Sequence, residues 1–144
     1  MSFPIRKLTP SDYDDLIALW KRCGLPHRPE GRDTRESIAW QMQRPDTFFR
    51  GTFDGDMLIG SVIGDSSGRK GWINRLAVHP DYRGKGLAGA LIKECEEFFE
   101  GLGLKVIGAL IEEDNEPSFS AFRKSGYTPA KNIIYWTKRA SDKD

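Results

Sequence analysis

The sequence is poor in cysteine and histidine, which leaves little material for a disulfide or a metal site. Its 144 residues include two cysteines and two histidines. Cys23 and Cys95 lie in segments with helical periodicity, where a small buried side chain is more common than a disulfide or a metal pair. No ligand spacing typical of zinc occurs. We therefore expect neither a disulfide nor a metal ion.

Long apolar runs and a strong net charge are also lacking. No run approaches the roughly 18 to 20 apolar residues of a membrane span, and residues 1–6 lack the apolar core of a signal peptide. We therefore expect a cytoplasmic protein with no membrane contact. A net charge of +1 argues against a broad basic surface for nucleic acid, but it leaves room for a local basic groove.

The chain does have enough apolar sequence for one core. With 38% apolar and 30% charged residues, a chain of this length is expected to form a single domain. We assign residues 1–139 to that domain and residues 140–144 to a solvated tail. No repeat or low-complexity segment interrupts it.

Helical and strand patterns alternate along the chain. Helical spacing of apolar side chains predicts helices that begin near residue 11, at 33 or 34, at 86 and at 115. Apolar runs between turn residues predict strands over residues 3–8, 47–53, 57–63, 72–78, 106–111 and 133–137. An Asp-Gly turn at residues 54–56 predicts a hairpin. The segment 25–33 contains two prolines and a glycine, so it is expected to be irregular.

The strand, helix and strand within residues 72–111 determine the predicted fold class. Two strands joined by such a crossover are expected to be parallel neighbours, whereas the flanking hairpins are antiparallel. The sequence therefore predicts an α/β (α+β) fold. Its sheet is mixed and mostly antiparallel, with a central parallel pair and helices on both faces.

The most informative segment joins an apolar strand to a glycine-rich helix start. Few side chains cover the backbone N–H groups between Gly84 and Gly89, and the helix dipole adds to their attraction for phosphate. Arg83 and Lys85 add positive charge. For an isolated pattern of this kind, the alternative is a turn that only connects a strand to a helix.

The pattern Gly84-Lys85-Gly86-Leu87-Ala88-Gly89 matches the glycine fingerprint of dinucleotide-binding proteins, but its context does not. That fingerprint requires an acidic residue about 20 positions further on, where this sequence has Leu104 and Lys105. A P-loop is excluded because no Gly-Lys-Ser or Gly-Lys-Thr follows at the required spacing. A phosphate site of another kind is favoured, and a nucleotide redox domain stays a weaker alternative.

Two spaced motifs resemble the GNAT family of N-acetyltransferases. Residues 83–88 fit the family's (Gln/Arg)-x-x-Gly-x-(Gly/Ala) motif, and they follow a strand end, Leu76-Ala77-Val78-His79-Pro80, that is also similar. A second pattern resembles the family's Asn-x-x-Ala-x-x-x-Tyr-x-Lys-x-Gly-Phe helix with three substitutions. Its residues here are Asn115, Ser118, Phe122, Lys124, Gly126 and Tyr127. In length and motif order the chain is similar to the family's single-domain bacterial and archaeal members.

The resemblance implies that acetyl-CoA binds where the two parallel strands splay apart. Its pyrophosphate would bind the N–H groups of Gly84 to Gly89, and its pantetheine would run along the backbone of Leu76 to Val78. The implied cofactor-binding residues are Leu76, Ala77, Val78, Arg83, Gly84, Lys85, Gly86, Leu87, Ala88, Gly89, Asn115, Ser118 and Phe122. An amine would attack the thioester carbonyl directly, and a backbone N–H at Leu76 or Val78 would stabilise the oxyanion.

The general acid of the family pattern is missing, because Phe122 occupies the position that often carries a tyrosine. One explanation is a substitute hydroxyl, with candidates Ser118, Ser120, Tyr127 and Tyr135. Another is that the thiol, with a pKa near about 8.5 for a comparable group, leaves unaided as thiolate. A third is binding without turnover. We favour the second, since a general acid contributes only about 10² to 10⁴ in rate.

The carboxylate that serves as general base in some relatives is also missing from its usual position. Some relatives have a carboxylate in the strand that here reads Asn74-Arg75. Glu112 and Glu113 are the remaining candidates, and strand alternation would put only one of them on the acceptor side. His79 precedes a proline, so we interpret it as a turn residue.

The acceptor is expected to be an amine, but its identity stays open. A small amine or amino acid, an aminoglycoside-like compound, and a protein N-terminus or lysine are all compatible. Specificity is expected from the first two helices and from the charged loop between them, which carries Arg28, Glu30, Arg32 and Asp33. A homodimer is left open. The alternative function is an acyl-CoA-binding sensor or regulatory module with little turnover.

Overall fold

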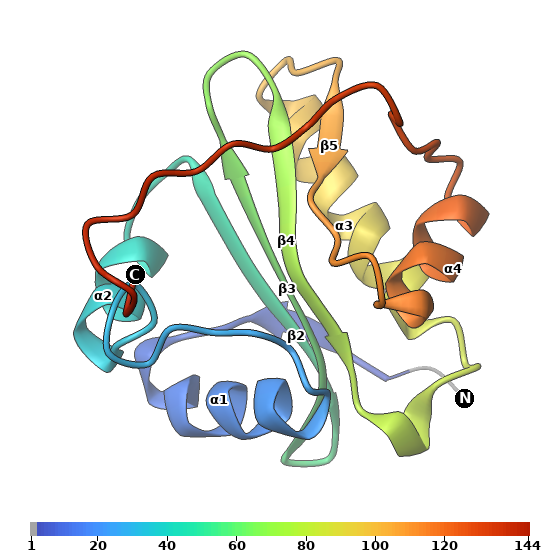
Figure 1. Cartoon of the computed structure of the whole chain (residues 1–144). Helices are drawn as coiled ribbons and strands as arrows, with labels where there is room; N and C mark the ends of the chain where they lie inside the picture. Colours follow the sequence, from blue (N-terminus) through green and yellow to red (C-terminus); the bar gives the residue numbers. More distant parts are fainter. Residues whose placement is uncertain (1–2) are drawn as a thin grey trace.

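The computed structural model describes residues 3–144, and its strands form one mixed sheet (Figure 1). The strands are β1 (Ile5–Lys7), β2 (Thr47–Asp54), β3 (Met57–Ser66), β4 (Gly71–Val78) and β5 (Ile107–Ala109). The helices are α1 (Tyr13–Arg22), α2 (Arg35–Met42), α3 (Leu87–Gly101) and α4 (Glu116–Lys124), with short 3-10 turns at Pro10–Asp12 and Pro80–Tyr82. The strand order is β1-β2-β3-β4-β5.

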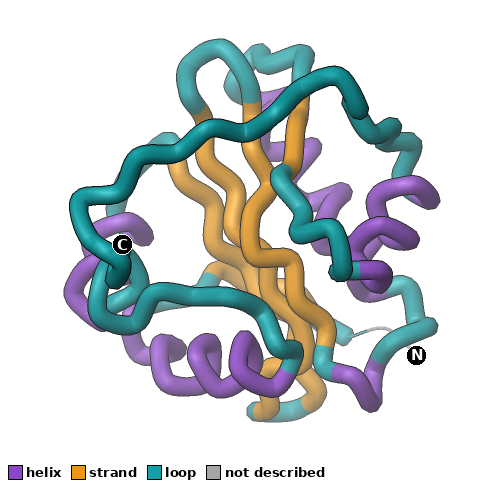
Figure 2. Tube along the Cα trace, in the orientation of Figure 1, coloured by secondary structure: helices purple, strands orange, loops and turns teal. Residues whose placement is uncertain are grey.

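Helices cover both faces of the sheet, as the sequence predicts (Figure 2). On one face, α1 and α2 bury Leu16, Trp20 and Ile38 against the sheet. On the other, α3 buries Leu91 and Phe99, which lie on one side of the helix because of their spacing. The mixed α/β fold is thereby confirmed, with antiparallel pairs from β1 to β4 and a parallel pair of β4 with β5.

The parallel pair separates soon after it begins. β4 and β5 are paired only from Gly71 to Ile73 of β4, and β4 then continues to Val78 with no partner on that side. The pairing of β3 with β4 slips between Ser61 and Ile63. At this bulge Arg75 has φ 51°, the only non-glycine residue with positive φ in the described chain. The bulge bends β4 away from β5 and leaves a free strand edge.

The predicted last strand over residues 133–137 is wrong. After α4 the described chain forms no helix or strand, and it crosses from α4 to the neighbourhood of α2 (Figure 1). Side chains of Ile133 to Trp136 are between 66% and 86% exposed. An apolar β-branched run forms a strand only when it pairs with a sheet edge, and in the described chain this run pairs with none. The parallel pair therefore lies at the end of the sheet, not at its centre.

The predicted strand over residues 106–111 is shorter in the structure and ends at Ala109. The predicted start of the second helix is confirmed, since the Thr34 side chain accepts a hydrogen bond from the N–H of Ser37. Residues 140–144 are largely exposed, and Lys143 forms an ion pair with Glu30 at 3.2 Å. Within residues 3–144 no helix is long and apolar enough to cross a bilayer.

Candidate functional site

A tight turn carries the chain from the end of β4 into α3. The ring nitrogen Nδ1 of His79 accepts a hydrogen bond from the N–H of Asp81 at 3.1 Å, so His79 caps the 3-10 turn. Gly84 and Gly86 then take φ values of 79° and 82°, which side-chain-bearing residues rarely adopt. These glycines turn the chain so that α3 begins at Leu87.

The start of α3 has the geometry of an anion-binding site. Its N-cap is Gly86, and no side chain caps it. The first backbone bond to this end runs from the N–H of Ala90 to the carbonyl of Gly86. Within the described chain no group accepts a hydrogen bond from the N–H groups of residues 84–89, and a Cβ added at Gly84, Gly86 or Gly89 would meet no atom within 4 Å. Free donors and open space together suit a phosphate.

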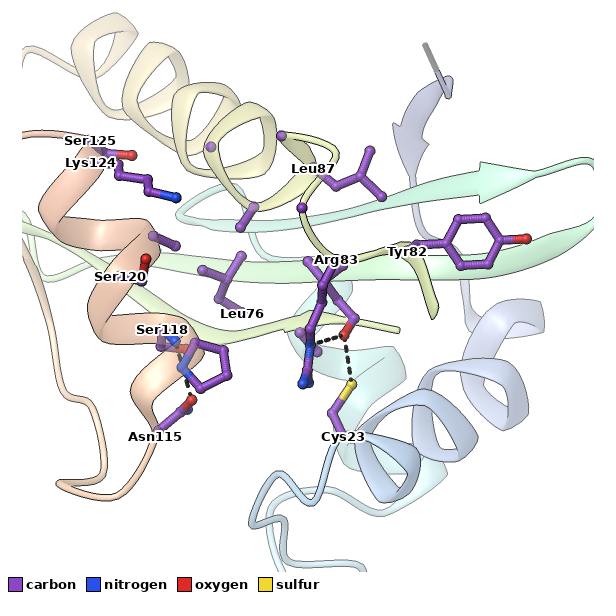
Figure 3. A pocket seen from close by; sticks show the side chains of 18 of the residues that line it. Cys23, Leu76, Tyr82, Arg83, Leu87, Asn115, Ser118, Ser120, Lys124 and Ser125 are labelled. Carbon is purple, nitrogen blue, oxygen red and sulfur yellow. Dashed lines mark hydrogen bonds between the residues drawn. The ribbon is translucent and has the colours of Figure 1, made fainter. Parts of the chain in front are cut away.

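Arg83 supports the turn from within the chain (Figure 3). Its Nε donates to the carbonyl of Val78 at 3.1 Å, and the Cys23 thiol donates to the same oxygen at 3.3 Å. Burial raises the pKa of the Cys23 thiol. Lys85 is exposed and does not line the cavity described next. Of these two cations, Arg83 is therefore the one that borders the cavity.

A cavity of about 520 Å³ runs from this turn along the free edge of β4 to α4 (Figure 3). It is lined by Cys23, Leu25, Leu76, Ala77, Val78, Tyr82, Arg83, Gly84, Gly86, Leu87, Ala88, Gly89, Asn115, Pro117, Ser118, Ser120, Ala121, Lys124 and Ser125. We call it the turn cavity. It contains most residues that the sequence analysis assigned to a cofactor. Cys23 was read there as an ordinary buried side chain, and only the fold brings it to the cavity.

Helix α4 supplies the wall opposite the free edge of β4. Asn115 is its N-cap, and the Asn115 side-chain oxygen accepts a hydrogen bond from the N–H of Ser118 at 3.3 Å. Lys124, at the other end of the helix, also lines the turn cavity. Phe122 does not; its ring is buried against Tyr127, with 5.0 Å between the ring centroids. Both polar ends of α4 thus border the turn cavity.

A second cavity of about 370 Å³ lies on the α1 and α2 side of β4. We call it the sheet cavity. It shares four residues with the turn cavity, namely Leu25, Leu76, Asn115 and Ser118. Leu76 has no partner in the β3–β4 register and lies beyond the last β4–β5 pair. The two cavities therefore meet at Leu76, a residue outside the regular pairing of β4.

The floor of the sheet cavity contains a buried ion pair. Arg75 Nη2 lies 2.9 Å from Asp33 Oδ2, and both side chains are largely buried. The Arg75 guanidinium also packs 4.8 Å from the centre of the Trp20 ring. Its other nitrogen, Nη1, is buried without a hydrogen-bond partner. Because Arg75 is the residue at the bulge, this pair ties the bend of β4 to the loop that follows α1.

Asp65, on β3, is a carboxylate of the sheet cavity that sequence reasoning missed. Its Oδ2 accepts a hydrogen bond from Asn74 Nδ2 at 2.8 Å. Burial, and then the nearby negative charge of Asp46, raise the pKa of Asp65 above its usual range. No Lys or Arg of the described chain forms an ion pair with it. Only the pairing of β3 with β4 brings Asp65 to the cavity, so spacing along the chain gave no signal.

The remaining candidates divide between the two cavities. Glu112 lines the sheet cavity and Glu113 lines neither. Tyr127 also lines neither cavity; its hydroxyl donates to Glu96 on α3 at 2.8 Å, and burial raises its pKa. Tyr135 lines the sheet cavity, and Ser120 lines the turn cavity. Ser118, which borders both, is therefore the hydroxyl nearest to their junction.

Comparison with known proteins gives a consistent result. The model of the Acetyltransferase (GNAT) family matches residues 13–127. An acetyltransferase of Sodalis glossinidius is 33% identical over 136 residues, which are 94% of this chain and 94% of that protein. One of Pectobacterium atrosepticum is 32% identical over 141 residues, which are 97% and 98% of the two chains.

Solved structures share the fold at lower identity. The PaiA N-acetyltransferase of Thermoplasma acidophilum, in complex with coenzyme A, has a TM-score of 0.78 and 24% identity, over 89% of this chain and 91% of that chain. AAC(6')-Iy, in complex with a bisubstrate analogue, also has a TM-score of 0.78, with 16% identity over 96% and 99% of the two chains.

Proposed function

Because the chain belongs to the Acetyltransferase (GNAT) family, it is an N-acetyltransferase that uses acetyl-CoA, and we propose how its two cavities divide that reaction. The turn cavity receives the cofactor and the sheet cavity receives the amine. The observation that carries this division is their junction at Leu76, where free backbone meets both spaces. One domain, residues 1–139, holds all of these parts.

The residues present fit the cofactor at both of its ends. The unpaired N–H groups of residues 84–89 would bind the pyrophosphate, since no protein atom competes for them or fills the space beside them. The free edge of β4 from Leu76 to Val78 offers backbone groups to an extended amide chain. Asn115 and Ser118 would contact that chain from α4.

When bound, acetyl-CoA supplies a thioester carbonyl as the acetyl donor. The N–H of Leu76 would stabilise negative charge on the carbonyl oxygen, because Leu76 lies at the junction and has no paired residue in the β3–β4 register. Phe122 has no proton to donate to the leaving thiolate. Of the substitute hydroxyls, Ser118 has the most suitable position, and unaided departure of the thiolate needs none.

The proton of the acceptor leaves on the sheet-cavity side. Glu112 is exposed and lines this cavity, so it is our candidate for the base. Glu113 lies outside both cavities, which supports the expectation that only one of the two faces the acceptor. A solvent-exposed carboxylate relays a proton to water without a costly buried charge.

The acceptor is a small amine in this proposal. AAC(6')-Iy is an aminoglycoside N-acetyltransferase, but at 16% identity its acceptor does not transfer to this chain. The sheet cavity has acidic and basic side chains in equal number: Asp33, Asp65 and Glu112 against Arg32, Arg75 and Arg139. Such a balance suits a small amine better than a molecule with many positive charges.

Release of free thiol from acetyl-CoA, measured across a panel of amines, tests the function. We expect release above the no-acceptor blank for at least one small amine, together with calorimetric binding of CoA. CoA binding without release for any amine would favour the alternative, an acyl-CoA sensor, for which the absence of a hydroxyl at Phe122 is the motivating observation. Absence of CoA binding would overturn the assignment of the turn cavity.

A further inference from the structure

Asp65 is the one charged residue of the sheet cavity that is partly shielded from solvent and has no ion-pair partner in the described chain. Arg75 and Asp33 neutralise each other at 2.9 Å. Arg32, Glu112 and Arg139 are exposed to solvent. Asp65 is half-buried, and its one side-chain contact is the neutral amide of Asn74. An unpaired carboxylate in a partly desolvated space is unfavourable on its own and favours a ligand that brings a positive charge.

The place that the Asp65 carboxylate reaches beside β4 decides what that charge belongs to. The Asp65 backbone pairs with Trp72, and its carboxylate reaches along the sheet to the side-chain amide of Asn74 on β4. Leu76, at the junction of the cavities, lies two residues further along, which is about 6 Å of bulged strand. Direct proton transfer needs a hydrogen bond of about 2.6–3.2 Å. Asp65 is thus too far from the transfer point to contact the reacting nitrogen.

We infer that Asp65 binds a second positively charged group of the acceptor, so that the substrate is a small amine carrying another ammonium about 6 Å from the nitrogen that is acetylated. This inference rests on the proposed function of the two cavities. Asn74 is a positioning residue, because its amide holds the Asp65 carboxylate toward the cavity.

The surroundings of Asp65 favour this role over anion binding. The nearby charged group that acts on it is Asp46, which is also negative and is paired with Arg44 at 2.8 Å. Asp33 already compensates the charge of Arg75, although Arg75 Nη1 is buried without a hydrogen-bond partner. Of the charges that the sheet cavity shields from solvent, the uncompensated one is therefore negative.

The test compares a linear diamine with the monoamine of the same chain length. For the unaltered protein we expect kcat/KM to favour the diamine by about tenfold to a hundredfold, the range for a hydrogen bond to a charged group. In Asp65→Asn this preference should vanish through a rise in KM for the diamine that exceeds any change in KM for the monoamine. Asn keeps an oxygen that accepts from Asn74, so the fold is preserved.

Asp46→Asn is the matched control, because it removes an equal charge near Asp65 from a residue that does not line the sheet cavity. It should retain the preference for the diamine. Equal use of both amines by the unaltered protein would overturn the inference and leave the acetyltransferase function standing. An equal loss of kcat for both amines in Asp65→Asn would also overturn it, in favour of proton transfer. No thiol release with any amine would remove the function and the inference together.

Discussion

Single glycines determine whether the turn before α3 can hold a phosphate. We predict that Gly86→Asp lowers the affinity for CoA by more than about a hundredfold, since opposing like charges costs several kcal/mol. The new side chain would occupy the space in which Gly86 now has no neighbour within 4 Å. Calorimetric titration with CoA measures the effect.

Gly103→Asp is the control for backbone strain. Gly103 has φ 78°, close to the 82° of Gly86, and its Cβ would also meet open space. It follows α3 at the end remote from the turn. Both variants should lose similar stability, but Gly103→Asp should bind CoA normally. Equal affinities for CoA in the two variants would show that the phosphate does not lie at Gly86.

The charged form of Asp65 also destabilises the folded protein, and the size of this effect depends on pH. Its pKa is raised in the folded protein, so folding favours its neutral form. The resulting stability is present below the unfolded pKa and is lost as the pH rises through the folded pKa. We predict that Asp65→Asn is more stable than the parent at neutral pH, by no more than about 1 kcal/mol for a half-buried, solvent-screened group.

Thermal unfolding of the two proteins across a pH series measures this difference. It should shrink as the pH falls toward the ordinary aspartate range, because the parent then carries a neutral Asp65 as well. Lower stability of Asp65→Asn at neutral pH would mean that the carboxylate is favourably bound within the empty protein. Substitutions in functional sites often stabilise the protein and weaken its function at the same time.

Among the elements, α4 combines a structural and a binding role in its first residue. Asn115 caps the helix and lines both cavities. We predict that Asn115→Ser keeps the cap and the thermal stability, but weakens CoA binding about threefold to tenfold through one lost hydrogen bond. Asn115→Ala should weaken binding similarly and also lose about 1 kcal/mol of stability.

Thermal unfolding and calorimetry on the same three proteins separate the two roles. If Asn115 acts only as a cap, Asn115→Ser will match the parent in both measurements. If it acts only in binding, Asn115→Ala will be as stable as the parent. The predicted pattern, with stability lost in one variant and affinity in both, requires both roles.

Elements with local signals could be predicted from the sequence, and elements that need a distant partner could not. The start of α3 follows from glycines and helical spacing within residues 84–99, and the structure agrees. The run Ile133 to Thr137 has a strand pattern but pairs with no sheet edge, so it stays irregular and exposed. A local pattern describes what a segment can form and not what it meets.

The same distinction applies to the site. The residues of the turn cavity are mostly contiguous in the chain, so two motifs were enough to find them. Asp65 reaches the sheet cavity through its register with Trp72 on β4, and the bulge at Arg75 depends on Asp33 in a distant loop. Charge pairs of this kind form only after the sheet does. The sequence therefore points to Glu112 and Glu113 and carries no local signal for Asp65.

At the scale of the whole molecule, the turn cavity lies between elements that the sheet does not join by strand pairing. Its walls are the free edge of β4, the start of α3 and the helix α4 (Figure 3). Beyond Ile73 no strand pairing connects β4 to β5. A ligand that spans these walls supplies contacts that the sheet lacks at this end, so its binding energy adds directly to the stability of the folded protein.

We therefore predict that CoA at a hundred times its dissociation constant stabilises the fold by about 2.7 kcal/mol, which raises Tm by roughly 10 °C for a chain of this size. NAD should give no shift, because the acid that a dinucleotide ribose requires about 20 positions after the glycines is replaced by Leu104 and Lys105. Gly86→Asp should lose the CoA shift while Gly103→Asp keeps it. Hydrogen exchange adds the location: amides of residues 84–90 and of the first turn of α4 should gain protection with CoA, and those of β1 and β2 should not. Equal protection everywhere would contradict binding across the splayed strands, since only the walls of the turn cavity touch the ligand.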